Sequence, residues 1–357
     1  MTKKSKSSAL QHKEGVSQSE ITNASSITKI QQQRKAKPTA QELISQIIKG
    51  NITALSRAIT LVESSNLKHL EQANDVIKGC LPYANTSIRI GITGVPGVGK
   101  STFIEAFGMH LTSIGKKVAV LAVDPSSSLS KGSILGDKTR MEDLVKNQNA
   151  FIRPSPSGNS LGGVARKTRE TIILCEAAGF DTIMIETVGV GQSEIAVHSM
   201  VDFFLLLKLA GAGDELQGIK RGIIEMADAI AINKADGDNL KAAKLAKVEF
   251  NRALHLYPQK NSEWQPKVLL CSALNREGIE DLWKVVRSYI EHSKANNYFD
   301  QNRTEQNKFW LLQTIEDRLK SDFFNQTTIK DALKRQLQLI EDSKTTPFVA
   351  AEYLLNL

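Results

Sequence analysis

Short apolar runs recur along the middle of the chain and predict the strands of a sheet. Ile88, Ile90 and Ile92 alternate with smaller or polar residues, as in a short strand, whereas residues 118–123 form an unbroken apolar run. An unbroken run of this length is typical of a strand that is buried on both faces. A shorter extended piece begins at Phe151. The remaining predicted strands are residues 182–185, 201–207, 229–232 and 268–270.

Segments with helical spacing separate these runs. Residues 103–114 follow the first strand and end at Gly115, and residues 164–178 repeat apolar positions with the helical period. A helix that returns the chain to the same edge of a sheet makes successive strands parallel. The sequence therefore predicts an α/β fold with a mainly parallel sheet and helices on both faces.

Apolar stripes with helical spacing also lie before and after the sheet-forming segment. Thr39 and Glu42 have the spacing of a capping box, and three helices are expected before the first strand. Apolar residues from Phe309 to Ile340 form further helical stripes, for which core packing and a dimer contact are both open. We expect an N-terminal helical subdomain, a central α/β domain and a C-terminal helical dimerisation region at residues 39–84, 85–296 and 297–357.

A glycine-rich motif joins the first strand to the helix that follows it. It has the pattern Gly-x-x-x-x-Gly-Lys-Ser between a strand and a helix, which is the context that a P-loop needs. Glycines remove the Cβ atoms that would hold the backbone away from a phosphate, and N–H groups at a helix N-terminus attract anions. We therefore predict a P-loop nucleoside triphosphatase. The predicted nucleotide-binding residues of the loop are Gly94, Val95, Pro96, Gly97, Val98, Gly99, Lys100, Ser101 and Thr102.

Polar residues near this loop and at the ends of predicted strands are candidates for catalysis and magnesium binding. Lys100 can reach the β and γ phosphates, and the hydroxyl of Ser101 suits Mg²⁺. Magnesium takes carboxylates directly or through water, and the candidates are Asp124, Asp137 and Glu186. Glu186 is the strongest of the three because it ends a buried strand, where a carboxylate without a partner would be costly.

The segment after this strand is a candidate sensor of the γ-phosphate. The N–H of Gly189 would meet that phosphate, so the residues that follow would respond to its presence. Gln192 has two open interpretations, since its side chain suits both the orientation of the attacking water and the capping of the next helix.

A second motif indicates the base. Asn233-Lys234-Ala235-Asp236 follows a predicted strand and matches the Asn-Lys-x-Asp element of guanine-nucleotide proteins. The carboxylate of Asp236 can accept hydrogen bonds from N1–H and the 2-amino group of guanine, a pair that adenine does not offer. Ser272-Ala273-Leu274, after the last predicted strand, resembles the loop that supports the base. The predicted ligands are therefore GTP or GDP together with Mg²⁺.

The composition argues against several classes of protein. No apolar run approaches the ~20 residues of a membrane span. The three cysteines, Cys80, Cys175 and Cys271, lie far apart, so neither a disulfide framework nor a cysteine-rich metal site is indicated. We expect a soluble, cytoplasmic protein with no membrane partner.

The net charge of +8 is concentrated in the first 40 residues. That segment has eight Lys and Arg and two Glu, which leaves +2 for the rest of the chain and argues against a nucleic-acid surface there. Residues 1–38 are rich in Ser, Lys, Gln and Thr, and we expect a disordered basic tail. A transit peptide would also be basic and Ser-rich, but a single Arg34 and the acidic Glu14 and Glu20 favour a cytoplasmic tail.

Six segments of the chain carry a resemblance to a known family, namely residues 94–102, 123–127, 132–141, 161–166, 186–194 and 213–220. Together they resemble the MeaB/ArgK group of G proteins, which includes GTPase chaperones of adenosylcobalamin-dependent methylmalonyl-CoA mutase. The resemblance implies a cytoplasmic homodimer with slow GTP turnover that binds this mutase, gates the delivery of adenosylcobalamin and protects the mutase. It extends from about residue 40 through the C-terminal helices.

The resemblance also implies three switch segments, at residues 124–141, 186–194 and 210–220. Lys220 in the third is a candidate for linking mutase contact to hydrolysis, although the residues alone favour a solvated helix lysine. Two other functions stay open. An amino-acid-transport-associated kinase, the older label of part of the group, would transfer phosphate to a protein, and no catalytic-loop Asp signature is found for it. A nickel-insertion metallochaperone would use Cys and His clusters, whereas the six histidines here are scattered.

Overall fold

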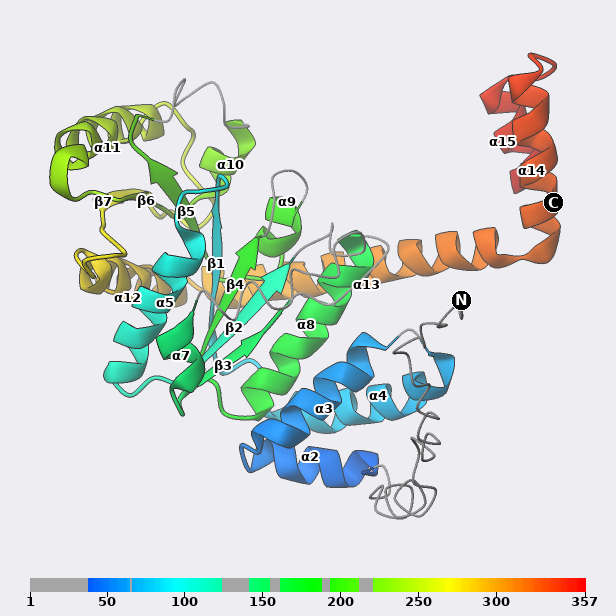
Figure 1. Ribbon diagram of the computed structural model, residues 1–357. Helices are drawn as coiled ribbons and strands as arrows, with labels where there is room; N and C mark the ends of the chain where they lie inside the picture. Colours follow the sequence, from blue (N-terminus) through cyan, green and yellow to red (C-terminus); the bar gives the residue numbers. More distant parts are fainter. Residues whose placement is uncertain (1–37, 65, 124–140, 155–160, 188–192, 212–220) are drawn as a thin grey trace, which may run out of the picture. The chain divides into compact units, whose positions relative to one another are not determined.

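The computed structural model is built around a parallel sheet with helices on both faces (Figure 1). It describes residues 38–357 except residues 65, 124–140, 155–160, 188–192 and 212–220. By their contacts, Ala40–Leu357 form one unit. Residues 1–37 of the expected tail lie outside the described residues.

In the described part of the chain, seven parallel strands form the sheet in the order β3-β2-β4-β1-β5-β6-β7. The predicted α/β fold is thus confirmed. β1 lies between β4 and β5, so that Ile90 pairs with both Met184 and Phe203. The extended piece expected at Phe151 is the edge strand β3, and its partial exposure explains its less regular apolar pattern. The strands are β1 (Ile88–Gly94), β2 (Val118–Val123), β3 (Ala150–Arg153), β4 (Thr182–Thr187), β5 (Phe203–Leu209), β6 (Ala229–Asn233) and β7 (Lys267–Leu270).

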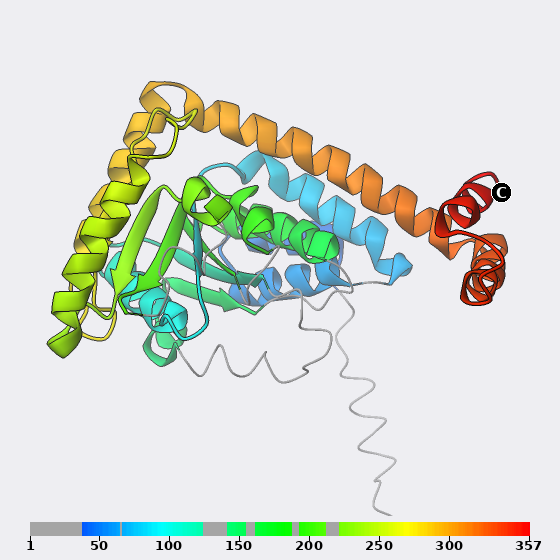
Figure 2. The ribbon, with the colours of Figure 1, turned by 90° about the horizontal axis from the view of Figure 1, so that it is seen from above.

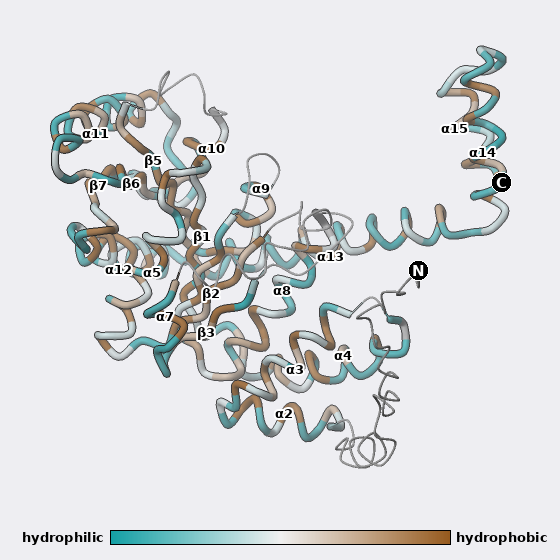
Figure 3. Tube along the Cα trace, viewed as in Figure 1, coloured by the Kyte–Doolittle hydropathy of each residue, from teal (hydrophilic) through white to brown (hydrophobic). Residues whose placement is uncertain are grey.

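Each face of the sheet has its own apolar core, and apolar residues dominate the strands between them (Figure 3). On one face, Phe103, Phe107 and Trp283 pack with Ile90, whereas Phe204 belongs to the core of the other face. The helices of the first face are α5 (Lys100–Ser113), α7 (Glu142–Lys146) and α12 (Ile279–Ala295), and those of the second are α8 (Leu161–Ala177), α9 (Ser193–His198), α10 (Arg221–Met226) and α11 (Leu240–Leu254).

Three helices precede the sheet and pack on α8. Gly50, with a φ of 77°, takes the left-handed conformation that often follows a helix, and Asn51 caps the next helix by accepting a hydrogen bond of 3.0 Å from the N–H of Ala54. Glu63 forms an ion pair with Arg153, which ties these helices to the edge strand. They are α2 (Ala40–Ile48), α3 (Ile52–Glu63) and α4 (Leu67–Cys80), and the short η1 (Leu81–Tyr83) leads to β1.

The first half of the long helix α13 (Tyr298–Asn325) is fixed to the body of the protein by a buried arginine. Arg303 donates two hydrogen bonds of 2.8 Å to the carboxylate of Asp202. It also donates to the carbonyl oxygens of Asn85 at 3.0 Å and Ser87 at 2.7 Å. These bonds join α13 to the residues that immediately precede β1 and β5.

The second half of α13 carries apolar side chains that the single chain leaves exposed. Leu311, Leu312 and Leu319 are 61%, 61% and 65% exposed. α14 (Thr327–Glu341) and α15 (Pro347–Leu355) follow at the far end of α13 and pack on each other (Figure 2). Core packing within one chain therefore does not account for these three leucines. In the described part of the chain, no helix is both long and apolar enough to cross a bilayer.

Candidate nucleotide-binding site

The loop from β1 to α5 has a backbone that requires glycine at two positions. Gly97 and Gly99 have φ angles of 80° and 92°, a region that other residues adopt only with strain. Gly94 lies so close to β5 that a Cβ atom there would be 2.6 Å from the carbonyl oxygen of Leu207. α5 begins at Lys100, and the N–H groups of its first turn point back toward the loop. This backbone suits the binding of a phosphate.

Lys100 lies over the loop, beside buried carboxylates. Its ammonium donates hydrogen bonds to the carbonyl oxygens of Gly94 at 2.8 Å and Val95 at 3.4 Å. Burial lowers the pKa of the Lys100 ammonium, while the charges of Glu186 and Glu194 act in the opposite direction. A charge in such a partly dehydrated position interacts more strongly with an anion than a surface lysine does.

The base-recognition motif after β6 contacts the P-loop directly. The amide of Asn233 donates a hydrogen bond of 2.8 Å to the carbonyl oxygen of Val98, and the ammonium of Lys234 donates one of 3.1 Å to that of Gly97. A Cβ atom on Gly99 would lie 2.9 Å from the amide nitrogen of Asn233. The third glycine of the loop thus makes room for the second motif.

The loop after β7 fixes the other end of the motif. The hydroxyl of Ser272 donates a hydrogen bond to the carboxylate of Asp236 and accepts one of 3.1 Å from the N–H of Asn275. The N–H of Ala273 donates to the side-chain oxygen of Asn233 at 3.2 Å. Leu274 is 80% exposed, so its side chain is open to solvent beside these two residues. The motif is therefore held from both sides.

The other predicted residues of the loop differ in exposure. Val95 and Ser101 are partly buried, Val98 is fully buried, and Pro96 and Thr102 are exposed. Val98 packs in the core below the loop, so it contributes its carbonyl rather than its side chain to the site.

The candidate ligands of magnesium are placed only in part. Ser101 lies in the first turn of α5, and Glu186, 4% exposed, lies at the end of β4. Both offer oxygen donors, which is the chemistry that magnesium prefers. Asp124 and Asp137 lie outside the described residues. Within the described residues, no three side chains of His, Cys, Asp or Glu gather as a metal-binding group.

Three candidate catalytic residues also lie outside the described residues, namely Gly189, Gln192 and Lys220. Most of the three expected switch segments falls there with them.

The structure adds contacts that the sequence did not indicate. The hydroxyls of Thr187 and Thr93 form a buried hydrogen bond of 2.9 Å between the ends of β4 and β1. Lys234 has a φ of 56°, and its carbonyl accepts a hydrogen bond of 2.7 Å from the side chain of Asn239. Asparagine is common in turns because its side chain can bond to nearby backbone groups. Which carbonyl oxygen the Asn239 side chain bonds to could not be predicted from the sequence.

Comparisons with known proteins show the family of this chain. Residues 55–328 match the family model described as methylmalonyl-CoA mutase-associated GTPase MeaB. A probable GTPase of Mycobacterium tuberculosis is 47% identical over 319 residues, which cover 89% of this chain and 95% of that protein. GTPase ArgK of Escherichia coli is 44% identical over 309 residues, which cover 87% of this chain and 93% of that protein.

A mitochondrial relative and a solved structure extend the comparison. The mouse methylmalonic aciduria type A homolog, described as mitochondrial, is 43% identical over 324 residues, 88% of this chain and 78% of that protein. A crystal structure described as LAO/AO transport system kinase is 38% identical with a TM-score of 0.72, and the match covers 90% of this chain and 98% of that one. The chain therefore belongs to the family of methylmalonyl-CoA mutase-associated GTPases called MeaB, and it is a GTPase with a P-loop fold.

Proposed function

We propose that this GTPase is a chaperone of an adenosylcobalamin-dependent acyl-CoA mutase, with methylmalonyl-CoA mutase as its client. It would use GTP to gate the delivery of adenosylcobalamin and would protect the mutase from inactivation. The name of the family and the methylmalonic aciduria name of the mouse relative support this proposal.

The observation that carries the proposal is the contact between the P-loop and the base-recognition motif. Because Asn233 and Lys234 donate to carbonyl oxygens of the loop, the two ends of a nucleotide would be bound by one hydrogen-bonded unit. The guanine would lie at Asp236 and the phosphates at Lys100. Such a site can distinguish GTP from GDP only through segments next to the γ-phosphate, and these are the segments that a client would contact.

Each residue of the site has a proposed part in binding. The backbone from Gly94 to Thr102 would surround the phosphates, and Lys100 would leave the carbonyls of its own loop to reach the β and γ phosphates. Asp236 would accept two hydrogen bonds from guanine, while Ser272, Ala273 and Leu274 would support the base.

Magnesium fits the oxygen donors of the site. Ser101 would bind it directly, and the carboxylates of Glu186, Asp124 and Asp137 would hold it directly or through water. The bound ion would neutralise charge on the phosphates during hydrolysis.

Three switch segments would couple the γ-phosphate to the client. We propose that the N–H of Gly189 contacts the phosphate and that Gln192 orients water or caps the helix behind it. Lys220 would connect client contact to hydrolysis. Loss of the phosphate would release these segments.

The exposed apolar stripe of α13 supports a homodimer. Leu311, Leu312 and Leu319 would be covered by the same face of a second copy, as in the two-fold contacts of most homodimers.

The experiment that tests this function measures GTP turnover with and without methylmalonyl-CoA mutase. We expect intrinsic turnover of about 10⁻⁴ to 10⁻² s⁻¹, a clear increase with the mutase, and a complex that elutes as one species. The Lys100→Ala variant, incubated with the mutase in the same way, is the matched control and should show no hydrolysis above background.

The same incubation separates the alternatives. Unchanged turnover together with no complex would contradict the chaperone function. Transfer of the labelled γ-phosphate to a protein would support the kinase, the activity for which the similar crystal structure is named. Tight binding of nickel by the isolated protein would instead support a metallochaperone.

A further inference from the structure

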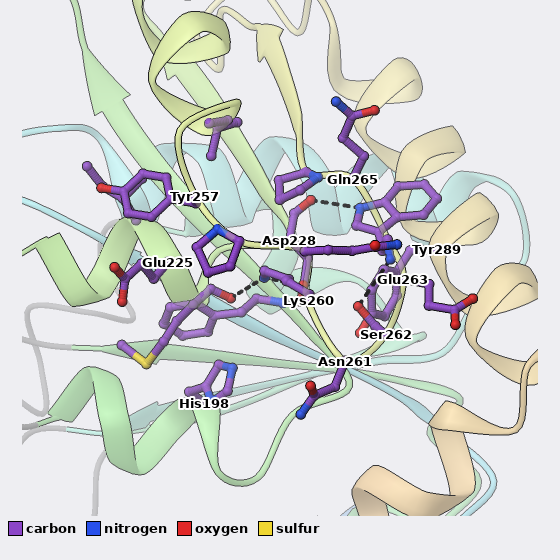
Figure 4. Close-up of a pocket in the computed structure, with 18 of the residues that line it drawn as sticks. His198, Glu225, Asp228, Tyr257, Lys260, Asn261, Ser262, Glu263, Gln265 and Tyr289 are labelled. Atoms are coloured by element: carbon purple, nitrogen blue, oxygen red, sulfur yellow. Dashed lines mark hydrogen bonds and ion pairs between the residues drawn. The ribbon is translucent and has the colours of Figure 1, made fainter.

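A cavity of about 710 Å³ lies at the edge of the sheet where the strands begin (Figure 4). It is lined by Asp202 and Asp228, which immediately precede β5 and β6, and by the loop between α11 and β7. The P-loop and Asp236 follow the ends of strands and therefore lie at the opposite edge. Binding sites for small molecules have volumes of about 300–1,000 Å³. The cavity is thus separate from the nucleotide site and large enough for an organic ligand.

Aromatic rings form part of the cavity wall. Trp264 and Tyr289 pack edge to face, with ring centroids 5.5 Å apart. The indole N–H of Trp264 donates a hydrogen bond of 3.0 Å to the carbonyl oxygen of Asp228, which fixes the ring. Lys267 already places its ammonium 5.7 Å from the centre of the Trp264 ring. The faces of such rings attract cations.

The charged groups of the cavity are mostly acidic. Among the described residues that line it, four are carboxylates and one, Lys260, carries an ammonium. Lys260 is already bound at 2.7 Å by the carboxylate of Asp228 and by two backbone carbonyls. Arg303, behind the wall, pairs with Asp202. Two of the four carboxylates are thus balanced by cations, and the one ammonium among the described lining residues is already paired. A phosphate or carboxylate ligand would meet no free ammonium there and is disfavoured.

His198 adds a neutral hydrogen-bonding group. Its ring lies edge-on to Phe204, with centroids 5.4 Å apart, and its side chain points to the cavity in Figure 4. Burial lowers the pKa of His198, so the imidazole is uncharged at pH 7. An uncharged imidazole has one nitrogen that accepts a hydrogen bond.

We infer that this cavity binds a small organic cation, an ammonium or guanidinium group carried on an apolar chain or ring. Aromatic faces take the apolar part, while the carboxylate of Glu263 and the uncharged imidazole of His198 accept the N–H groups. The cation is either a free metabolite or a basic side chain of a partner protein, since both present the same chemistry.

Two short helices connect the cavity to the nucleotide edge. α9 and α10 begin directly after residues 188–192 and 212–220, and they end at the cavity with His198 and Met226. Lys260 donates to the carbonyl oxygens of Met226 and Ala227, so the cavity loop caps the end of α10. A ligand that contacts both helix ends therefore changes the rate of GDP release. This second part of the inference rests on the proposed function.

The experiment uses the full chain, free of nucleotide, and three probes that share one ring. Phenethylamine is a cation, 2-phenylethanol is neutral and phenylacetate is an anion, and their binding is measured by titration calorimetry and by saturation-transfer nuclear magnetic resonance. We expect phenethylamine to bind with a Kd of about 1 mM and the other two at least about tenfold more weakly. Equal binding of the three compounds, or no binding of the amine, would overturn the inference.

Two variants of residues that line the cavity test whether the amine binds there. Asn261→Trp puts a large side chain into the cavity from an exposed position, and Glu263→Lys reverses a charge of the lining. The first should weaken amine binding more than about tenfold and the second about threefold, with unchanged thermal unfolding. Glu249→Lys, on the exposed face of α11, is the matched control and should bind like the parent. Parent-like binding by Asn261→Trp would place the amine elsewhere.

Release of a fluorescent GDP analogue tests the connection to the nucleotide. Saturating phenethylamine should change the release rate at least about threefold in the parent and not in Asn261→Trp. Amine binding with unchanged release would overturn the connection, whereas a failure to bind GDP would count against the proposed nucleotide site and not against the cavity. Binding of an end-blocked Gly-Arg-Gly peptide more tightly than phenethylamine would assign the cation to a partner protein.

Discussion

The nucleotide edge of the sheet and the second half of α13 reverse the usual distribution of polar and apolar residues in opposite ways. At the nucleotide edge, Asn233 and Ser272 are fully buried although their side chains are polar. Along α13, Leu312 and Leu319 are largely exposed although their side chains are apolar. Burying a polar side chain and exposing an apolar one are both unfavourable in the isolated chain. The two regions differ in what compensates for this.

At the nucleotide edge the chain itself satisfies the buried polar groups. Asn233 bonds to the P-loop and to the loop after β7, and Ser272 bonds to Asp236. Asn233 and Ser272 are therefore held in place by the chain itself. On α13 no comparable neighbour in the described chain covers the leucines, and covering each would contribute about 1.5–3 kcal/mol. The buried polar groups of the first region therefore have their partners within the chain, whereas the described chain leaves the apolar surface of the second region open to solvent.

The largest effect is expected where α13 changes from buried to exposed. Arg303→Ala should destabilise the protein by about 3–5 kcal/mol, because it leaves the buried carboxylate of Asp202 without its cation. Urea unfolding measures this loss. Arg318→Ala, which removes an exposed ion pair with Asp322 on the same helix, should cost at most about 1 kcal/mol. Equal losses in the two variants would show that the first half of α13 is no better fixed than the second.

The next effect concerns the phosphates. Lys100→Ala should weaken GTP binding about 100-fold, because a partly buried ammonium that serves the phosphates is lost. Equilibrium titration with a fluorescent GTP analogue measures the change. Lys284→Ala, on an exposed face of α12, should titrate like the parent. A normal affinity in Lys100→Ala would refute the placement of the phosphates at this loop.

A smaller effect is expected at the base. Asp236→Asn should weaken GTP binding about 30-fold, since an amide cannot accept both N–H donors of guanine. The same variant should bind XTP more tightly than the parent does, because xanthine offers an oxygen where guanine has its 2-amino group. Competition titrations measure both values, with Asp238→Asn, an exposed neighbour, as the control. Unchanged preference for GTP over XTP would place the base away from Asp236.

The smallest effect is expected at the exposed stripe. Leu312→Glu should weaken self-association about tenfold, because a charge would replace an apolar contact between two copies. Sedimentation equilibrium at several concentrations measures the constant. Lys244→Glu, at an exposed position of α11, is the control. A parent protein that is monomeric at all concentrations would leave the exposed leucines to another partner and contradict the proposed homodimer.

The fold and the motif positions were predictable to different extents. Two features could be predicted because they depend only on residues that are neighbours in the sequence. The unbroken apolar run at residues 118–123 forms the strand β2, and the glycine pattern of the P-loop lies between the strand β1 and the helix α5. β3 was expected only as a short extended piece, because an edge strand needs fewer apolar residues. The limits of β5 differ by two residues from the predicted range, since apolar residues extend beyond both ends of the paired segment.

The amino-acid sequence by itself determined which local elements form, because strands, helix starts and glycine turns depend on the spacing of residue types over a few positions. It also determined the chemistry available to the site, a lysine, a hydroxyl and carboxylates in recognisable motifs. The tertiary structure alone decided that Asn233 bonds to Val98, 135 residues away, that Arg303 meets Asp202, and that an acidic, aromatic cavity lies where the strands begin. These contacts depend on the strand order of the sheet, which brings distant segments together and leaves no periodic trace in the sequence.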